Sequence, residues 1–168
     1  DRWKIIKAIY RSDKLTRAQK DEYYQKQILI DPSDIGRRTK NYCDALVADE
    51  VEKDTIWYMM FEEYMNIDQD FLKEYALGFN EEKNAPFLGK YYEEFFIRLI
   101  GLYLQGQFVY GDILFKCLFP KRDDLEVLVD QIDIVLEQLS IEGIESKLIK
   151  NEKDELIKRI QAYKLIEK

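Results

Sequence analysis

The chain has 168 residues, of which 46% are hydrophobic and 35% are charged, and its formal net charge is −7. This composition is typical of a globular protein and excludes an intrinsically disordered chain. The sequence contains only 7 Gly and 3 Pro. Because an all-β protein needs one of these residues at most of its turns, their scarcity favours an all-α fold.

The spacing of apolar residues and the signals for helix starts predict nine helices joined by short connections. They cover residues 2–11, 16–30, 33–48, 50–64, 68–79, 85–104, 107–118, 123–139 and 142–166, and the last is expected to break near Asn151. Short connections make neighbouring helices antiparallel. Since no strict repeat accompanies the pairs, we expect an irregular α-solenoid, a HEAT- or armadillo-like array of antiparallel helix pairs, in one domain over residues 1–168.

Several helix starts carry recognisable caps. Capping boxes, in which two side chains each accept a backbone N–H of the first turn, are predicted at 16–19, 49–52 and 123–126. Asp31 is expected to cap a helix whose first residue is Pro32, because proline has no N–H to satisfy there. Asn84 is expected to cap the helix that contains Pro86 in the same way.

Two helices carry long apolar stripes at the spacing of three and four residues that marks one helix face. We expect these stripes to form core, with the following side chains buried: Leu88, Tyr92, Phe95, Leu99, Leu128, Ile132 and Leu139. The two cysteines, Cys43 and Cys117, lie within amphipathic segments and are expected to be free, buried thiols. Free thiols favour the cytoplasm over an oxidising compartment, although they do not fix it.

The sequence offers no catalytic centre. It contains no histidine, which excludes the H-E-x-x-H zinc site and the nucleophile systems that rely on a histidine base. Adjacent carboxylates such as Glu93 and Glu94 point about 100° apart on a helix and cannot converge on one substrate. We therefore expect no catalytic residue and no metal site within the chain.

Charge and hydropathy argue against two further classes of function, nucleic-acid binding through residues 1–40 and a membrane span. Residues 1–40 are basic, with 11 Lys or Arg against 6 Asp or Glu, but they carry no nucleic-acid recognition motif. The acidic remainder would repel phosphate, so we interpret the charges as solvated helix faces. No run of about 18 apolar residues is present, so no membrane span is expected.

A series of short motifs occurs in a characteristic order. These are Arg2-Trp3-Lys4, Asp31-Pro32-Ser33-Asp34, Lys53 with Trp57 four residues later, Gly78-Phe79, Lys90-Tyr91-Tyr92 with Phe95-Phe96, and Leu118-Phe119-Pro120. Lys53 is expected to cover the ring of Trp57, and Gly78 to end its helix in the left-handed conformation. The series resembles the C-terminal helical domain of the aminopeptidase N family of zinc aminopeptidases, which includes the puromycin-sensitive and endoplasmic-reticulum aminopeptidases.

The resemblance implies that the chain is the C-terminal domain of a longer zinc aminopeptidase. Such a domain is non-catalytic: it walls the chamber that encloses the active site and influences which peptides enter and of what length. Its partners would be peptide substrates and an upstream catalytic domain of the same chain, which would hold the zinc ion. The alternative from the residues themselves is a free-standing helical scaffold that binds a protein partner in a groove.

Arg37 and Arg38 are the candidate peptide-binding residues. They follow Asp31-Pro32 in the basic part of the sequence. A guanidinium can hold a carboxylate through two parallel hydrogen bonds, which suits the terminal carboxylate of a peptide. The competing interpretation is that one of them pairs with Asp34, three or four residues earlier.

Overall fold

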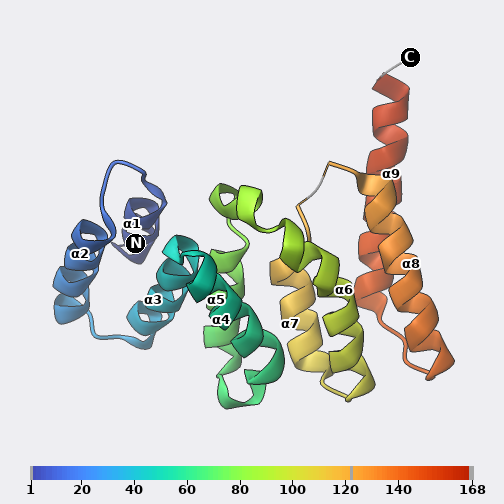
Figure 1. Ribbon diagram of the computed structural model, residues 1–168, viewed down its shortest axis with the longest axis horizontal. Coiled ribbons are helices and arrows are strands. Elements are labelled where there is room, and N and C mark those ends of the chain that lie inside the picture. The colour runs from blue at the N-terminus through green and yellow to red at the C-terminus, as the bar shows by residue number, and fades with distance from the viewer. Residues whose placement is uncertain (1, 122, 167–168) are drawn as a thin grey trace. The chain divides into compact units, whose positions relative to one another are not determined.

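The computed structural model describes residues 2–121 and 123–166, and within them the chain is all-α (Figure 1). The α-helices are α1 (Arg2–Arg11), α2 (Arg17–Ile30), α3 (Asp34–Val47), α4 (Glu50–Glu62), α5 (Gln69–Phe79), α6 (Gly89–Leu104), α7 (Phe108–Leu118), α8 (Leu125–Ile141) and α9 (Lys147–Ile166). Two short 3₁₀ helices, η1 (Tyr64–Asn66) and η2 (Glu82–Phe87), complete the set. The chain forms two compact units, residues 1–89 and 90–168. The all-α prediction is confirmed, while the solenoid arrangement and the single domain stay predictions.

The capping boxes at α2 and α4 are confirmed. Thr16 accepts from the backbone N–H of Gln19 and Asp49 from that of Glu52, and the Gln and Glu side chains accept the N–H of the two caps in return. Each box satisfies two backbone donors that the first turn of a helix leaves free. These two helix starts could therefore be located from four residues each.

Four predictions about helix ends are wrong. Ser33, not Asp31, caps α3, and Asp124, not Asp123, caps α8. Asn84 lies inside η2, and α6 begins only at Gly89. The last helix begins at Lys147 after a turn at Gly143, which has a φ of 71°, and it continues through Asn151 without a break. At α3 and α8 a neighbouring polar residue takes the capping role that the sequence pattern gave to another.

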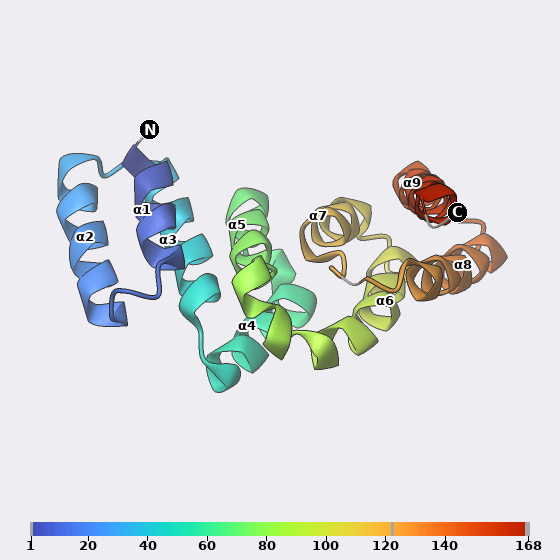
Figure 2. The ribbon, with the colours of Figure 1, turned by 90° about the horizontal axis from the view of Figure 1, so that it is seen from above.

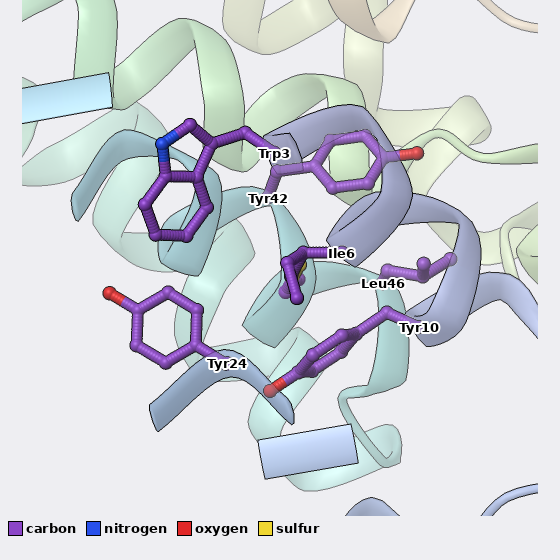
Figure 3. Packing of buried hydrophobic residues seen from close by; sticks show 7 residues of the cluster. Trp3, Ile6, Tyr10, Tyr24, Tyr42 and Leu46 are labelled. Carbon is purple, nitrogen blue, oxygen red and sulfur yellow. The ribbon is translucent and has the colours of Figure 1, made fainter. Parts of the chain in front are cut away.

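The first part of the core of residues 1–89 lies where α1 and α2 pack against α3 (Figure 2). It consists of Trp3, Ile6, Tyr10, Tyr24, Tyr42, Cys43 and Leu46 (Figure 3). Tyr10 and Cys43 are completely buried, as expected for a free thiol that packs as a small apolar group. This cluster uses four aromatic rings, so the three helices are joined by large amphipathic side chains.

Helix α5 approaches the backbone of α3 at Gly78. A Cβ atom at this position would lie 2.0 Å from the carbonyl oxygen of Tyr42. Gly78 has no positive φ and lies inside α5, so the expectation that it ends the helix in the left-handed conformation is wrong. Its role is to let two helix backbones touch.

We predict that Gly78→Ala destabilises residues 1–89, because the methyl group would force α5 away from α3. Overpacking of this kind costs roughly 1–3 kcal/mol, and a clash with backbone belongs at the upper end. Both tryptophans, Trp3 and Trp57, lie in this unit, so urea unfolding followed by tryptophan fluorescence measures the effect. Gly101→Ala is the control: it adds a Cβ to α6 with nothing within 4 Å and is expected to stabilise by about 0.5–1 kcal/mol. Because Gly101 lies in the second unit, which has no tryptophan, its effect is measured by far-UV circular dichroism in urea. Equal effects of the two changes would contradict the close approach.

The core of residues 90–168 contains the predicted apolar stripes from Tyr92 onward, whereas Leu88 belongs to the first unit. Every residue of the two stripes is buried, and Phe95, Leu99, Ile132 and Leu139 have no exposed surface. The ring of Phe95 lies 5.0 Å from that of Phe96 and stacks on Phe115 of α7 at 6.5 Å. Helix α9 packs along α8 (Figure 1). The prediction that these stripes form core is confirmed.

Truncating Phe95 to alanine is expected to lower the free energy of unfolding by about 3–5 kcal/mol, the cost of removing a large core aromatic. Far-UV circular dichroism in urea is the appropriate measurement, because the second unit contains no tryptophan. The exposed Ile97, on the same helix, is 72% accessible, and Ile97→Ala serves as the control with a loss of less than about 1 kcal/mol. A small loss for Phe95→Ala would show that this stripe faces solvent or a partner.

Candidate functional site

The two candidate arginines lie in the second turn of α3, and their surroundings differ. Arg37 is 65% exposed, and its nearest carboxylate oxygen, on Asp34, is 3.7 Å away. Arg38 is 34% exposed, and its Nη2 lies 2.6 Å from the other oxygen of Asp34. Its Nη1 contacts the carboxylate of Asp70 on α5. The pairing with Asp34 was foreseeable from the spacing of the sequence, but the contact with Asp70 depends on how α5 packs.

These contacts give the two arginines different capacities. Arg38 connects α3 and α5 through its ion pairs with Asp34 and Asp70. Its Nε is buried without a hydrogen-bond acceptor among the described residues. Among the described residues Arg37 forms only one long contact, with Asp34, so its donors are available to a carboxylate from outside. The structure therefore favours Arg37 over Arg38 as a binding residue, whereas peptide binding by either stays a prediction.

The first motif of the series joins α1 to the start of α3. The indole N–H of Trp3 donates to Asp31 at 2.7 Å, and Asp31 also accepts the backbone N–H of Ser33 at 3.3 Å. The hydrogen bond from Trp3 holds the pKa of Asp31 below its usual value. A Cβ on Gly36 would lie 2.5 Å from the Trp3 ring. The segment Asp31–Gly36 is thus shaped to receive this tryptophan.

Lys53, from the third motif, is almost completely buried, with 2% of its surface exposed. Its ammonium donates to the carbonyl oxygen of Ala45 in the last turn of α3 at 3.1 Å. It lies 5.3 Å from the centre of the Phe79 ring, and Phe79 in turn stacks on Trp57 at 5.6 Å. The lysine therefore covers Phe79, not the expected Trp57. Burial lowers its pKa to about 8.

Sequence reasoning missed a second lysine in the same situation. Lys20 is 5% exposed, and its ammonium donates to the carbonyl oxygen of Tyr10 in the last turn of α1 at 3.0 Å. Burial lowers its pKa as well. Lys20 and Lys53 each come directly after a capping box, so the pattern cap-x-x-Gln/Glu-Lys could have identified both. A lysine in this position satisfies a carbonyl that the end of the preceding helix leaves free.

Asn84 was also given the wrong role. Its side chain, 4% exposed, donates to the carbonyl oxygens of Gly78 and Phe79 at 3.2 and 3.1 Å. It therefore completes the C-terminal end of α5 rather than the start of a helix. The sequence alone carries no clear signal for this role, because the contact forms only once η2 folds back onto α5.

The described residues contain no group of three or more His, Cys, Asp or Glu side chains that could hold a metal ion. No helix among them is both long and apolar enough to cross a bilayer. Comparison with family models, with curated proteins and with solved structures finds no match.

The burial of Lys53 predicts a specific dependence of stability on pH. Its pKa of about 8 in the folded chain lies below the unfolded value of 10.5, so folding favours the neutral amine. Burying the charged ammonium therefore lowers the stability of the fold. This loss is complete below pH 8 and disappears as the pH rises towards 10.5. Relative to Lys53→Met, the free energy of unfolding of the native chain should rise by about 2–3 kcal/mol between pH 7 and 10, since each pKa unit corresponds to 1.36 kcal/mol.

The measurement is urea unfolding by tryptophan fluorescence at several pH values, and the quantity compared is the difference between the two proteins. Lys73→Met, at an exposed position of α5, is the control and should leave that pH dependence unchanged. A constant difference between the native chain and Lys53→Met would show that the ammonium of Lys53 is solvated.

Proposed function

We propose that this chain is the non-catalytic C-terminal helical domain of a zinc aminopeptidase. In this role it walls the chamber around the active site and influences which peptides enter and how long they are. Zinc and the catalytic residues would belong to an upstream domain of the same protein. The chain itself would contribute helices and surface.

One observation carries the proposal. Several of the residues on which the family resemblance rests make contacts in the fold that depend on their own residue type. Trp3 and Asp31 are joined by a hydrogen bond. Lys53 completes the end of α3 from a buried position, and Gly78 is the point where α5 touches the backbone of α3. Generic helix-forming composition would not demand a tryptophan, a buried lysine and a glycine at these positions. A resemblance in such residues supports common descent more strongly than one in apolar residues.

Sequencing the transcript that encodes this chain tests the proposal directly. We expect an in-frame H-E-x-x-H motif upstream, followed by a further Glu, which together supply the ligands and general base of this class of zinc site. The full-length protein should release the N-terminal residue of peptides and lose this activity to a zinc chelator. An upstream sequence without these residues would leave the helical scaffold as the function.

The role of Arg37 is tested in the full-length enzyme. Arg37→Ala should lower kcat/KM for a free peptide by a factor that corresponds to about 1.5–3 kcal/mol, the value of a hydrogen bond to a charged group. The kcat/KM for the C-terminal amide of that peptide should stay unchanged. A single-residue chromogenic amide should also be unaffected. Arg38→Ala is the comparison, because it removes the contacts to Asp34 and Asp70 and should lower stability. Equal losses for all three substrates would assign both arginines to the fold.

A further inference from the structure

A cavity of about 290 Å³ lies within residues 1–89, between the first residue of α2 and helices α3, α4 and α5. This volume is just below the range of about 300–1,000 Å³ in which drug-sized ligands bind, and it suits a single side chain. Ile56 and Met59 of α4 form its apolar wall, with Tyr75 of α5 beside them. Asp44 of α3, with Arg17 and Glu52, supplies its charges.

The charges around this cavity do not balance. Arg17 donates to both oxygens of Glu52 at 2.8 Å, so these two neutralise each other. Lys40 contacts Asp44 and lies 3.7 Å from Asp21, so that one cation serves two carboxylates. The cluster therefore carries one negative charge in excess. Of the two carboxylates that share Lys40, Asp44 is the one that lines the cavity.

Two residues that line the cavity, Asp44 and Tyr75, each have an acceptor without a donor among the described residues. Lys40 donates to one oxygen of Asp44, and in the described part of the chain the second oxygen has no donor. The hydroxyl of the half-buried Tyr75 likewise has no hydrogen-bond partner among those residues. Burial, and then the charge of Asp44, raises the pKa of Tyr75, which places the phenol within the field of this carboxylate. An apolar wall beside two acceptors and an excess negative charge complements a cation on a hydrocarbon stem.

We propose that this cavity binds the side chain of a lysine or arginine residue of a peptide, with the cationic head at Asp44 and Tyr75 and the methylene stem against Ile56 and Met59. The inference goes beyond the proposed function and does not depend on it, because the cavity lies entirely within residues 1–89. It also concerns residues other than Arg37 and Arg38.

The test uses the chain labelled with ¹³C at its methionine methyl groups, observed by NMR during titration with Nα-acetyl-lysine amide. The three methionines form a built-in control, because Met59 lines the cavity, Met60 is completely buried and Met65 is 66% exposed. We expect a saturable shift of the Met59 signal alone. Nα-acetyl-norleucine amide, which has a similar stem without the charge, should bind at least about tenfold more weakly.

Variants identify the groups that hold the cation. Asp44→Asn should weaken binding of the lysine derivative at least about tenfold, and Tyr75→Phe should weaken it several-fold. Glu82→Gln, at an exposed position in the same unit, should have no effect. An unchanged Met60 signal in each variant shows that the fold is intact.

Three results would overturn the proposal. Equal affinity for the norleucine derivative would show an apolar cavity without charge selection. Tighter binding of Nα-acetyl-glutamate amide would assign the cavity to an anion held by Arg17. No saturable shift of Met59 with any of the three probes would show that the cavity is not a binding site. None of these outcomes bears on the presence of an upstream zinc domain, so the two proposals fail separately.

Discussion

The contact between Gly78 and the carbonyl group of Tyr42 is the constraint on which residues 1–89 depend. Because no side chain separates the two backbones there, α5 lies closer to α3 than ordinary side-chain packing allows. This approach brings Phe79 against Trp57 and under the ammonium of Lys53. The packing of α5 on α3 also places Asp70 beside Arg38. Both the ion pair between Arg38 and Asp70 and the cavity beside Tyr75 thus depend on the position of α5.

Buried polar groups then fix the ends of the helices. Lys20, Lys53 and Asn84 each donate to backbone carbonyls in the last turn of a helix. A buried carbonyl without a donor is costly, so a helix end can enter the core only with such a partner.

Patterns local to a few residues were predictable from the sequence. The apolar stripe through Phe95 and the capping box of Thr16 operate within one or two helical turns, and both are confirmed. The roles of Gly78, Asn84 and Asp70 depend on contacts between segments that are distant in the sequence, and periodicity carries no information on these. The candidate site shows the same division, because the pairing of Arg38 with Asp34 follows from helix geometry whereas the contact with Asp70 does not.

Amide hydrogen exchange under native conditions tests the central role of the α3–α5 contact most directly. If the two helices form one cooperative unit, the amides of residues 34–47 and 69–79 should share one free energy of opening, the highest in the first unit. Exchange in α5 through an opening of much lower free energy than that of α3 would contradict the account. In that case α5 would be a peripheral helix, and the first unit would depend on the cluster of α1, α2 and α3 alone.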